Sequence, residues 1–140
     1  MKSNIKEAYF KYYDEIYRAK EYEKELNFIC SILDKYDAKP KKILEFGSGT
    51  CRLSILLAKQ FTDITCIDSS IDMINSAKLN LSKEPQYIKS RIKLKNCDLR
   101  KINLKSKFDL IISLFHVASY CTTNNCLNSF FQRAYEHLNK

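Results

Sequence analysis

Apolar positions recur along the chain with two different periods, and the period predicts which element each segment forms. Residues 5 to about 36 repeat apolar and aromatic positions at helical spacing, so we expect a helix in two pieces that ends before Pro40. Short and nearly continuous apolar runs, typical of buried strands, follow later in the chain. The expected strands cover residues 42–46, 64–68, 91–98 and 108–115.

Amphipathic segments between these strands predict the intervening helices. One helix is expected to start near Cys51, a second to follow a cap at Ser69 or Ser70, and a last one to run from about Asn124 to Leu138. Alternation of strand and helix implies an α/β fold with a parallel sheet and right-handed crossovers. The second helix is expected to bury Ile71, Met73, Ile74 and Ala77 on its inner side.

The positive charge concentrates where polar and apolar residues alternate. The chain of 140 residues carries a net charge of +8, and lysine and arginine alternate with apolar residues from Ile88 to Lys95. A period of two indicates the outward face of a strand. Such a face could attract nucleic acid or another anion, but a solvated lysine face is the simpler interpretation. We therefore do not expect nucleic acid as a partner.

Composition excludes several classes of protein. The hydrophobic share of 45% and the charged share of 29% are globular values, and no apolar run reaches the roughly 18 residues of a membrane span. Residues 1–6 lack an apolar signal core, so a cytoplasmic location is expected. The six cysteines form no C-x-x-C pair and no Cys/His cluster, which favours reduced thiols over disulfides or a metal site. We expect an N-terminal helical cap, residues 1–38, and a core, residues 39–140.

The chain has only two glycines, and both follow the first predicted strand, at Gly47 and Gly49. Glycine suits a backbone that turns tightly or approaches a ligand closely, and open α/β sheets bind ligands at the carboxyl ends of their strands. Asp68 ends the second predicted strand and Asp98 the third. Alone, these features could be a tight turn, a helix cap and a loop acid. Together, at three successive strand ends, they predict one ligand cleft.

These strand ends resemble the motifs of the class I S-adenosylmethionine-dependent methyltransferases. The similar stretches are residues 43–51, which match the acid-x-Gly-x-Gly-x-Gly motif, and residues 67–73, 96–99 and 108–113, which match the later motifs. Cys51 replaces the third glycine of the family, at a position where the helix opens and a Cβ could be tolerated. We expect this replacement to weaken cofactor binding rather than abolish it. Glu45, and Arg52 where a dinucleotide fingerprint has glycine, favour S-adenosylmethionine over a nicotinamide dinucleotide.

The resemblance implies S-adenosylmethionine as the cofactor and a Rossmann-like fold with strand order 3-2-1-4 and helices on both faces. Glu45, Gly47 and Gly49 would then cradle the methionine moiety of the cofactor. Asp68 would hold the ribose hydroxyls, and Ser113 would lie close to the reacting methyl group.

Three further positions would contact the adenine ring according to this resemblance. Met73 would lie near the ring, Asp98 would accept a hydrogen bond from its amine, and Leu99 would offer its backbone N–H.

A narrower similarity joins the N-terminal tyrosines to the segment after the fourth strand. Residues 13–22 and 113–120 resemble the small-molecule methyltransferases that include amino-sugar N,N-dimethyltransferases. Tyr13 and Tyr17 would fold over the cofactor, and Tyr120 would face the acceptor. Tyrosines four residues apart can equally be packing neighbours on a helix.

His116 follows the fourth predicted strand, near where an acceptor would lie. A histidine there can accept a proton at neutral pH, so His116 and Tyr120 are the candidate catalytic residues. The alternative is that His116, beside Phe115 and Val117, is a packing residue. His137, on the last predicted helix, is expected to be structural.

The similarity covers nearly the whole chain but only the first part of the family domain. The fourth strand is therefore expected at an edge of the sheet, where a second copy or a partner chain could pair with it. The expected function is methyl transfer from S-adenosylmethionine to a small molecule such as a sugar amine. A truncated, non-catalytic domain or a subunit completed by a partner chain is the alternative.

Overall fold

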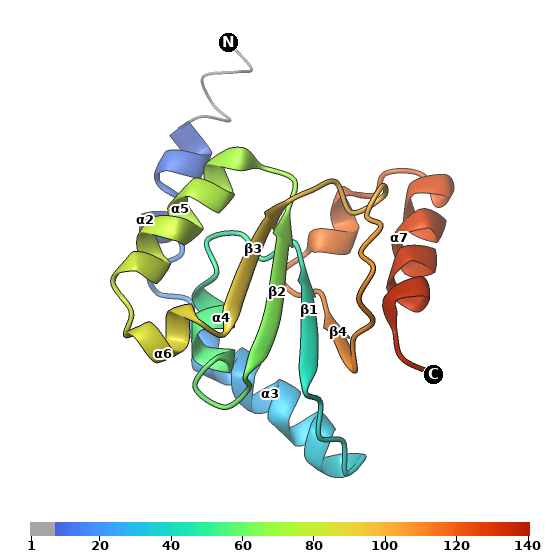
Figure 1. The fold of residues 1–140 in the computed structure, drawn as a ribbon. Coiled ribbons are helices and arrows are strands. Elements are labelled where there is room, and N and C mark those ends of the chain that lie inside the picture. Colours follow the sequence, from blue (N-terminus) through green and yellow to red (C-terminus); the bar gives the residue numbers. More distant parts are fainter. Residues whose placement is uncertain (1–7) are drawn as a thin grey trace.

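The computed structural model describes residues 8–140, so Ile5 and the start of the predicted cap lie outside the described residues. Four parallel strands form one sheet with the order β3-β2-β1-β4, which confirms the predicted fold class (Figure 1). The strands are β1 (Lys42–Phe46), β2 (Asp63–Asp68), β3 (Ile92–Asn96) and β4 (Leu110–Ile112).

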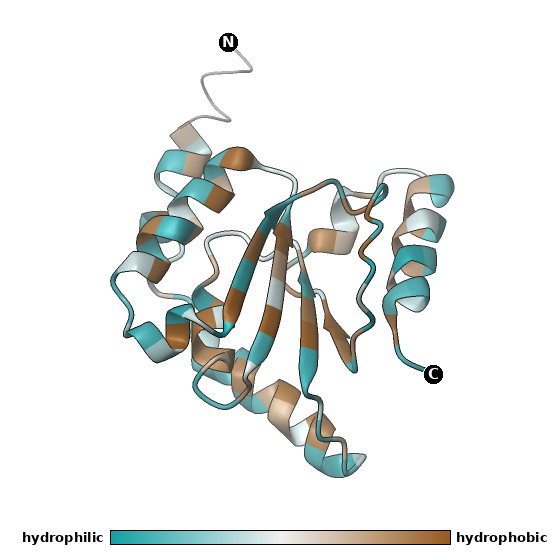
Figure 2. Cartoon of the chain, viewed as in Figure 1, coloured by the Kyte–Doolittle hydropathy of each residue, from teal (hydrophilic) through white to brown (hydrophobic). Residues whose placement is uncertain are grey.

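Helices cover both faces of this sheet. In chain order they are α2 (Tyr13–Ile16), α3 (Tyr22–Lys35), α4 (Arg52–Leu57), α5 (Ile71–Ser82), α6 (Gln86–Lys89), the 3₁₀ turn η1 (Val117–Tyr120) and α7 (Asn124–His137). Helices α3, α4 and α5 pack on one face, while α7 packs on the other. Hydrophobic residues accordingly concentrate on the strands and on the inward sides of the helices (Figure 2).

Side chains of β1 point alternately to the two faces of the sheet and contribute to two separate hydrophobic cores. Ile43 packs against α3 and α4, whereas Leu44 and Phe46 point to the other face and pack with Phe130 of α7. Both faces of β1 are therefore buried, which explains the continuous apolar run of a central parallel strand. The end of β1 is fixed between two neighbours, and this position carries the glycine turn.

Two strands, β4 and β3, do not have the predicted boundaries. Strand β4 stops at Ile112 because Phe115 and His116 adopt left-handed backbone conformations, with φ of 56° and 65°, that a strand cannot continue. Strand β3 begins only at Ile92 because Pro85 starts the short helix α6, so Lys89 is not on the lysine face of the strand.

The start of α5 also differs in part from the expectation. Ser70, not Ser69, caps this helix by accepting a hydrogen bond from the Met73 N–H. Ile71 is 52% exposed rather than buried. It precedes Met73 by two residues, and two residues turn an α-helix by roughly 200°, so the two side chains point in nearly opposite directions.

Residues beyond α7 return to the side of β4. Leu138 forms a parallel bridge with Phe108, and the Asn139 N–H donates to the Phe108 carbonyl over 2.8 Å. Within residues 8–140, no strand pairs with the outer edge of Leu110–Ile112. Pairing of that edge with another chain stays a prediction.

His137 is structural, as expected. It is buried, its Nε2 accepts from the Leu104 N–H over 2.9 Å, and its Nδ1 donates to the Arg133 carbonyl. The histidine thus joins α7 to the loop before β4. In the described part of the chain, no helix is long and apolar enough to span a membrane.

Candidate functional site

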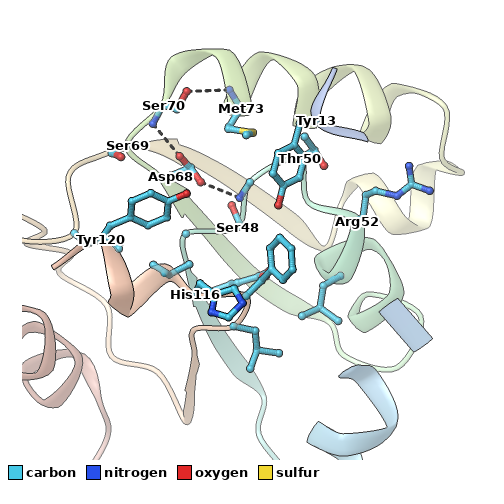
Figure 3. A pocket seen from close by; sticks show the side chains of 18 of the residues that line it. Tyr13, Ser48, Thr50, Arg52, Asp68, Ser69, Ser70, Met73, His116 and Tyr120 are labelled. Atoms are coloured by element: carbon cyan, nitrogen blue, oxygen red, sulfur yellow. Dashed lines mark hydrogen bonds between the residues drawn. The ribbon is translucent and has the colours of Figure 1, made fainter. Parts of the chain in front are cut away.

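A cavity of about 580 Å³ lies at the carboxyl ends of the strands (Figure 3). Its wall includes every predicted site residue except Ser113: Tyr13, Tyr17, Glu45, Gly47, Gly49, Asp68, Met73, Asp98, Leu99, His116 and Tyr120. The Ser113 hydroxyl instead donates to the Phe46 carbonyl and ties the end of β4 to β1. Four strand ends therefore build one site, as the positions of the motifs predict.

The two glycines of the turn have different roles. Both have left-handed φ angles, 67° at Gly47 and 54° at Gly49. A Cβ on Gly47 would come within 2.4 Å of a Val117 methyl carbon, so this glycine lets η1 pack onto the turn. A Cβ on Gly49 would meet only the Tyr13 hydroxyl, at 3.9 Å, and would project into the cavity. Gly49 is thus the position that leaves room for a ligand.

Ser48, between the glycines, is a site residue that the sequence analysis missed. Its side chain lines the cavity, and its hydroxyl oxygen is buried without a hydrogen-bond partner among the described residues. A buried hydroxyl without a partner is unfavourable, so a ligand atom that completes it would gain a hydrogen bond. The motif treats this position as variable, and only the fold reveals where the side chain points.

Cys51, which replaces the third glycine of the motif, has a backbone conformation that favours glycine. It precedes α4 with φ of 62° and ψ of 22°, and its side chain is fully buried. The expectation that this position has room for a Cβ is confirmed, since the Cys51 side chain packs in the core. The backbone is nevertheless left-handed, a conformation that L-residues other than glycine adopt at a cost.

Asp68 fixes the geometry of the turn from the end of β2. One carboxylate oxygen accepts from the Gly49 N–H over 2.9 Å, and the other accepts from the Ser70 N–H over 2.8 Å. Burial raises the pKa of this carboxyl, although both backbone hydrogen bonds oppose the shift. Each oxygen keeps a free lone pair, so Asp68 can accept two further hydrogen bonds from a ligand.

Glu45 is a buried acid at the floor of the cavity. Its carboxylate accepts a hydrogen bond from the Ser54 hydroxyl, and burial raises the pKa of Glu45 to about 7. Lys20 also lines the cavity and pairs with Glu25 over 3.0 Å. Glu45 therefore shares this part of the cavity with an ion pair, and a cationic group of a ligand beside Glu45 would favour its ionised form.

Asp98 lies at the cavity wall but is already paired. Arg100 donates from Nε to one carboxylate oxygen over 2.9 Å and from Nη2 to the other over 2.5 Å. These hydrogen bonds lower the pKa of Asp98 to about 2 and keep it ionised. The sequence analysis missed Arg100, since the sequence does not show that the Arg100 side chain points toward Asp98.

Aromatic side chains cover the cavity from the N-terminal side. The ring centroids of Tyr13 and Tyr17 lie 4.7 Å apart, and Tyr17 meets Phe115 edge-on at 4.8 Å. The tyrosines therefore pack on each other and line the cavity at the same time. His116 and Tyr120 follow Phe115 on the opposite wall, and Tyr120 is 76% exposed.

The left-handed backbone at Cys51 predicts the relative stability of two variants. Cys51→Ala and Cys51→Gly both remove the buried sulfur, but only glycine adopts this conformation without penalty. We expect the glycine variant to be more stable than the alanine variant by about 1 kcal/mol in urea unfolding. Equal stabilities, or a more stable alanine variant, would contradict the proposed backbone penalty.

The raised pKa of Glu45 predicts a pH dependence of stability. Folded Glu45 titrates near a pKa of about 7 and the unfolded side chain near 4.5, so the folded state binds more protons between these values. The free energy of unfolding should therefore fall as pH rises from about 5 to about 8. Glu45→Gln should lose this fall, whereas Glu23→Gln, an exposed site on α3, should retain it. Parallel pH profiles of the free energy of unfolding for wild type and Glu45→Gln would argue against a raised pKa of Glu45.

Comparison with known proteins places the chain in a family. Residues 43–140 match the family described as methyltransferase domain. Among solved structures, the chain is similar to an S-adenosylmethionine-dependent methyltransferase from Clostridium acetobutylicum, with 24% identity, a TM-score of 0.78, and coverage of 97% of this chain and 54% of that one. No curated protein matches the sequence.

Two further solved structures are similar to the chain in fold. DesVI from Streptomyces venezuelae is 25% identical over 92% of this chain and 52% of its own, with a TM-score of 0.80. CalS10 from Micromonospora echinaspora, an amino pentose methyltransferase solved with S-adenosylmethionine bound, is 19% identical over 91% and 51%, with a TM-score of 0.78. The chain thus spans about half the length of these structures. The matched family and the shared fold confirm the resemblance drawn from the motifs, and the chain belongs to the methyltransferase domain family.

Proposed function

We propose that the chain binds S-adenosylmethionine in this cavity and takes part in methyl transfer to a small-molecule acceptor. The observation that carries the proposal is the contact between Asp68 and the glycine turn, 2.9 Å from the Gly49 N–H, at the edge of an open cavity. This contact places a carboxylate with free lone pairs beside a backbone that a ligand can approach closely.

The residues present fit two polar groups of the cofactor, its ribose and the ammonium of its methionine moiety. Asp68 would accept from the two ribose hydroxyls, and Glu45 would accept from the ammonium group of the methionine moiety. Support comes from the unpartnered Ser48 hydroxyl and from the open space above Gly49. A buried glutamate and an orphaned hydroxyl are both groups that a polar ligand would satisfy.

Met73, Leu99 and Asp98 would surround the adenine ring. Met73 and Leu99 offer apolar contact from the wall of the cavity. Asp98 Oδ1 already accepts from the Arg100 backbone N–H and from Nε. Asp98 would therefore accept from the adenine amine through Oδ2, in place of the long 3.2 Å contact from Arg100 Nε. Arg100 keeps Asp98 ionised, which strengthens such a hydrogen bond.

The chemistry of the proposed reaction needs alignment more than acid–base help. When bound, the cofactor supplies a methyl group on a cationic sulfur, which leaves readily. The aromatic residues Tyr13, Tyr17 and Phe115 would exclude water and hold the donor and acceptor in line. His116 would accept the proton that an acceptor amine loses, and Tyr120 would face the acceptor from the rim.

An amine on a sugar is the acceptor that we favour. The support is the similarity in fold to CalS10, which is described as an amino pentose methyltransferase. The alternative is a non-catalytic domain whose sheet is completed by another chain, supported by the unpaired outer edge of Leu110–Ile112 within the described residues. A chain that binds the cofactor product and methylates no acceptor would favour this alternative.

Titration calorimetry with S-adenosylhomocysteine tests the cofactor site. Wild type should bind, and Asp68→Ala should bind about ten- to a hundredfold more weakly because hydrogen bonds to a charged group are lost. Asp72→Ala is the matched control, since Asp72 is an exposed acid on the first turn of α5. No binding by wild type at millimolar ligand would refute the proposal, and so would equal binding by Asp68→Ala.

The proposed role of His116 predicts a change in the rate of methyl transfer to amino sugars. His116→Ala should lower the rate by about a hundredfold or more, the usual contribution of a positioned base. Mass spectrometry of the acceptor gives the rate. An unchanged rate would assign His116 to packing.

A further inference from the structure

One carboxylate, that of Asp14, joins the N-terminal segment to the glycine turn. One Asp14 oxygen accepts from the Thr50 hydroxyl over 2.6 Å, and the other accepts from the Asn80 amide of α5 over 2.7 Å. Arg52, at the start of α4, lies 4.0 Å from the second oxygen. A single side chain of α2 therefore contacts the turn and the two helices that flank it.

The contact with Thr50 is direct and partly buried. Thr50 follows Gly49 in the turn and is only 3% exposed. The same Asn80 amide nitrogen that donates to Asp14 also lies 3.2 Å from the Thr50 carbonyl. Asp14, Thr50 and Asn80 thus form a closed set of hydrogen bonds around one residue of the turn. Because both Asp14 oxygens are engaged at once, the set fixes the direction of the side chain as well as its position.

Helix α2 depends on such contacts because it has little stability of its own. It contains four residues, buries none of them, and has no side-chain cap, and among the described residues only one helical turn, residues 8–11, precedes it. Isolated helices of this length do not persist in water, so tertiary contacts must hold α2 in place. Its neighbour Glu15 does not supply them, since its pair with Arg18 is largely exposed and contributes little.

Asp14 lies between the residues that cover the cavity. Tyr13 precedes it, and the Tyr13 hydroxyl is the nearest atom to the open side of Gly49. Tyr17 follows it by one turn and reaches across to Phe115. Asp14 thus ties the segment that carries both tyrosines to the glycine turn.

We propose that Asp14 is a positioning residue that holds the tyrosine cover on the glycine turn through Thr50 and Asn80, and so slows the release of a ligand bound beneath it. The second part rests on the proposed function, because it assumes that S-adenosylmethionine or its product occupies the cavity. The first part is a property of the ligand-free protein and can be tested without any ligand.

Hydrogen exchange of the ligand-free chain tests the first part. The informative amides are those of Ile16 and Tyr17, which donate to the Tyr12 and Tyr13 carbonyls. Asp14→Ala and Thr50→Val should each raise their exchange rates by about tenfold or more, because a hydrogen bond to a charged group is lost. Amides of β1 and β2 should not change, which shows that the core remains folded.

Two matched variants separate positioning from a general loss of structure. Thr50→Ser keeps the hydroxyl and should restore slow exchange of the two amides. Glu15→Gln removes a neighbouring charge that faces solvent and should leave exchange at the wild-type rate. Wild-type exchange in Asp14→Ala, or fast exchange in Thr50→Ser, would overturn the proposal.

Dissociation of S-adenosylhomocysteine, followed by stopped flow, tests the second part. Asp14→Ala and Thr50→Val should release this probe about tenfold faster, with Thr50→Ser close to wild type. Equal dissociation rates alongside faster amide exchange would refute the link to the ligand while leaving the positioning role intact. If wild type binds no S-adenosylhomocysteine, the proposed function and the second part both fail, and the exchange result still decides the first part.

Discussion

The hydrogen bonds of Asp68 to two backbone N–H groups hold the candidate site together. One bond, 2.9 Å from the Gly49 N–H, joins the end of β2 to the turn after β1, and the other, to the Ser70 N–H, starts α5. The turn is left-handed at Gly47, Gly49 and Cys51, and such a backbone persists only where the surroundings determine it. Asp68, at the end of the neighbouring strand β2, holds the turn in this conformation through its hydrogen bond with Gly49. Its carboxylate keeps lone pairs for a ligand.

The glycine turn also positions the two segments that pack on it, η1 and the N-terminal tyrosines. Val117 fits against the bare backbone of Gly47, so η1 and the residues beside it approach the end of β1 closely. Thr50 binds Asp14 and thereby brings the N-terminal tyrosines over the same opening. The two walls of the cavity come from segments that are far apart in the sequence, and both are fixed by contacts with residues 47–51.

The carboxyl groups that line the cavity differ in charge. Glu45 lies with Glu25 and Lys20, and burial raises its pKa to about 7. Asp98 is partly exposed and hydrogen-bonded to Arg100, and its pKa falls to about 2. Identical chemical groups thus differ in protonation because one is desolvated and the other is paired. A ligand with a cationic group at one end and a hydrogen-bond donor at the other would complement both.

The sequence by itself determined the helices of the core and the strand ends that carry Gly47, Asp68 and Asp98, because periodicity and short motifs lie within local stretches of the chain. The sheet order was implied only by the resemblance of those motifs to a known family. Only the tertiary structure decided the pairing of Asp98 with Arg100, the contact of Asp14 with Thr50, the orphaned hydroxyl of Ser48 and the early end of β4. The physical reason is that side-chain direction, burial and left-handed backbone depend on neighbours from other elements, which no local pattern records.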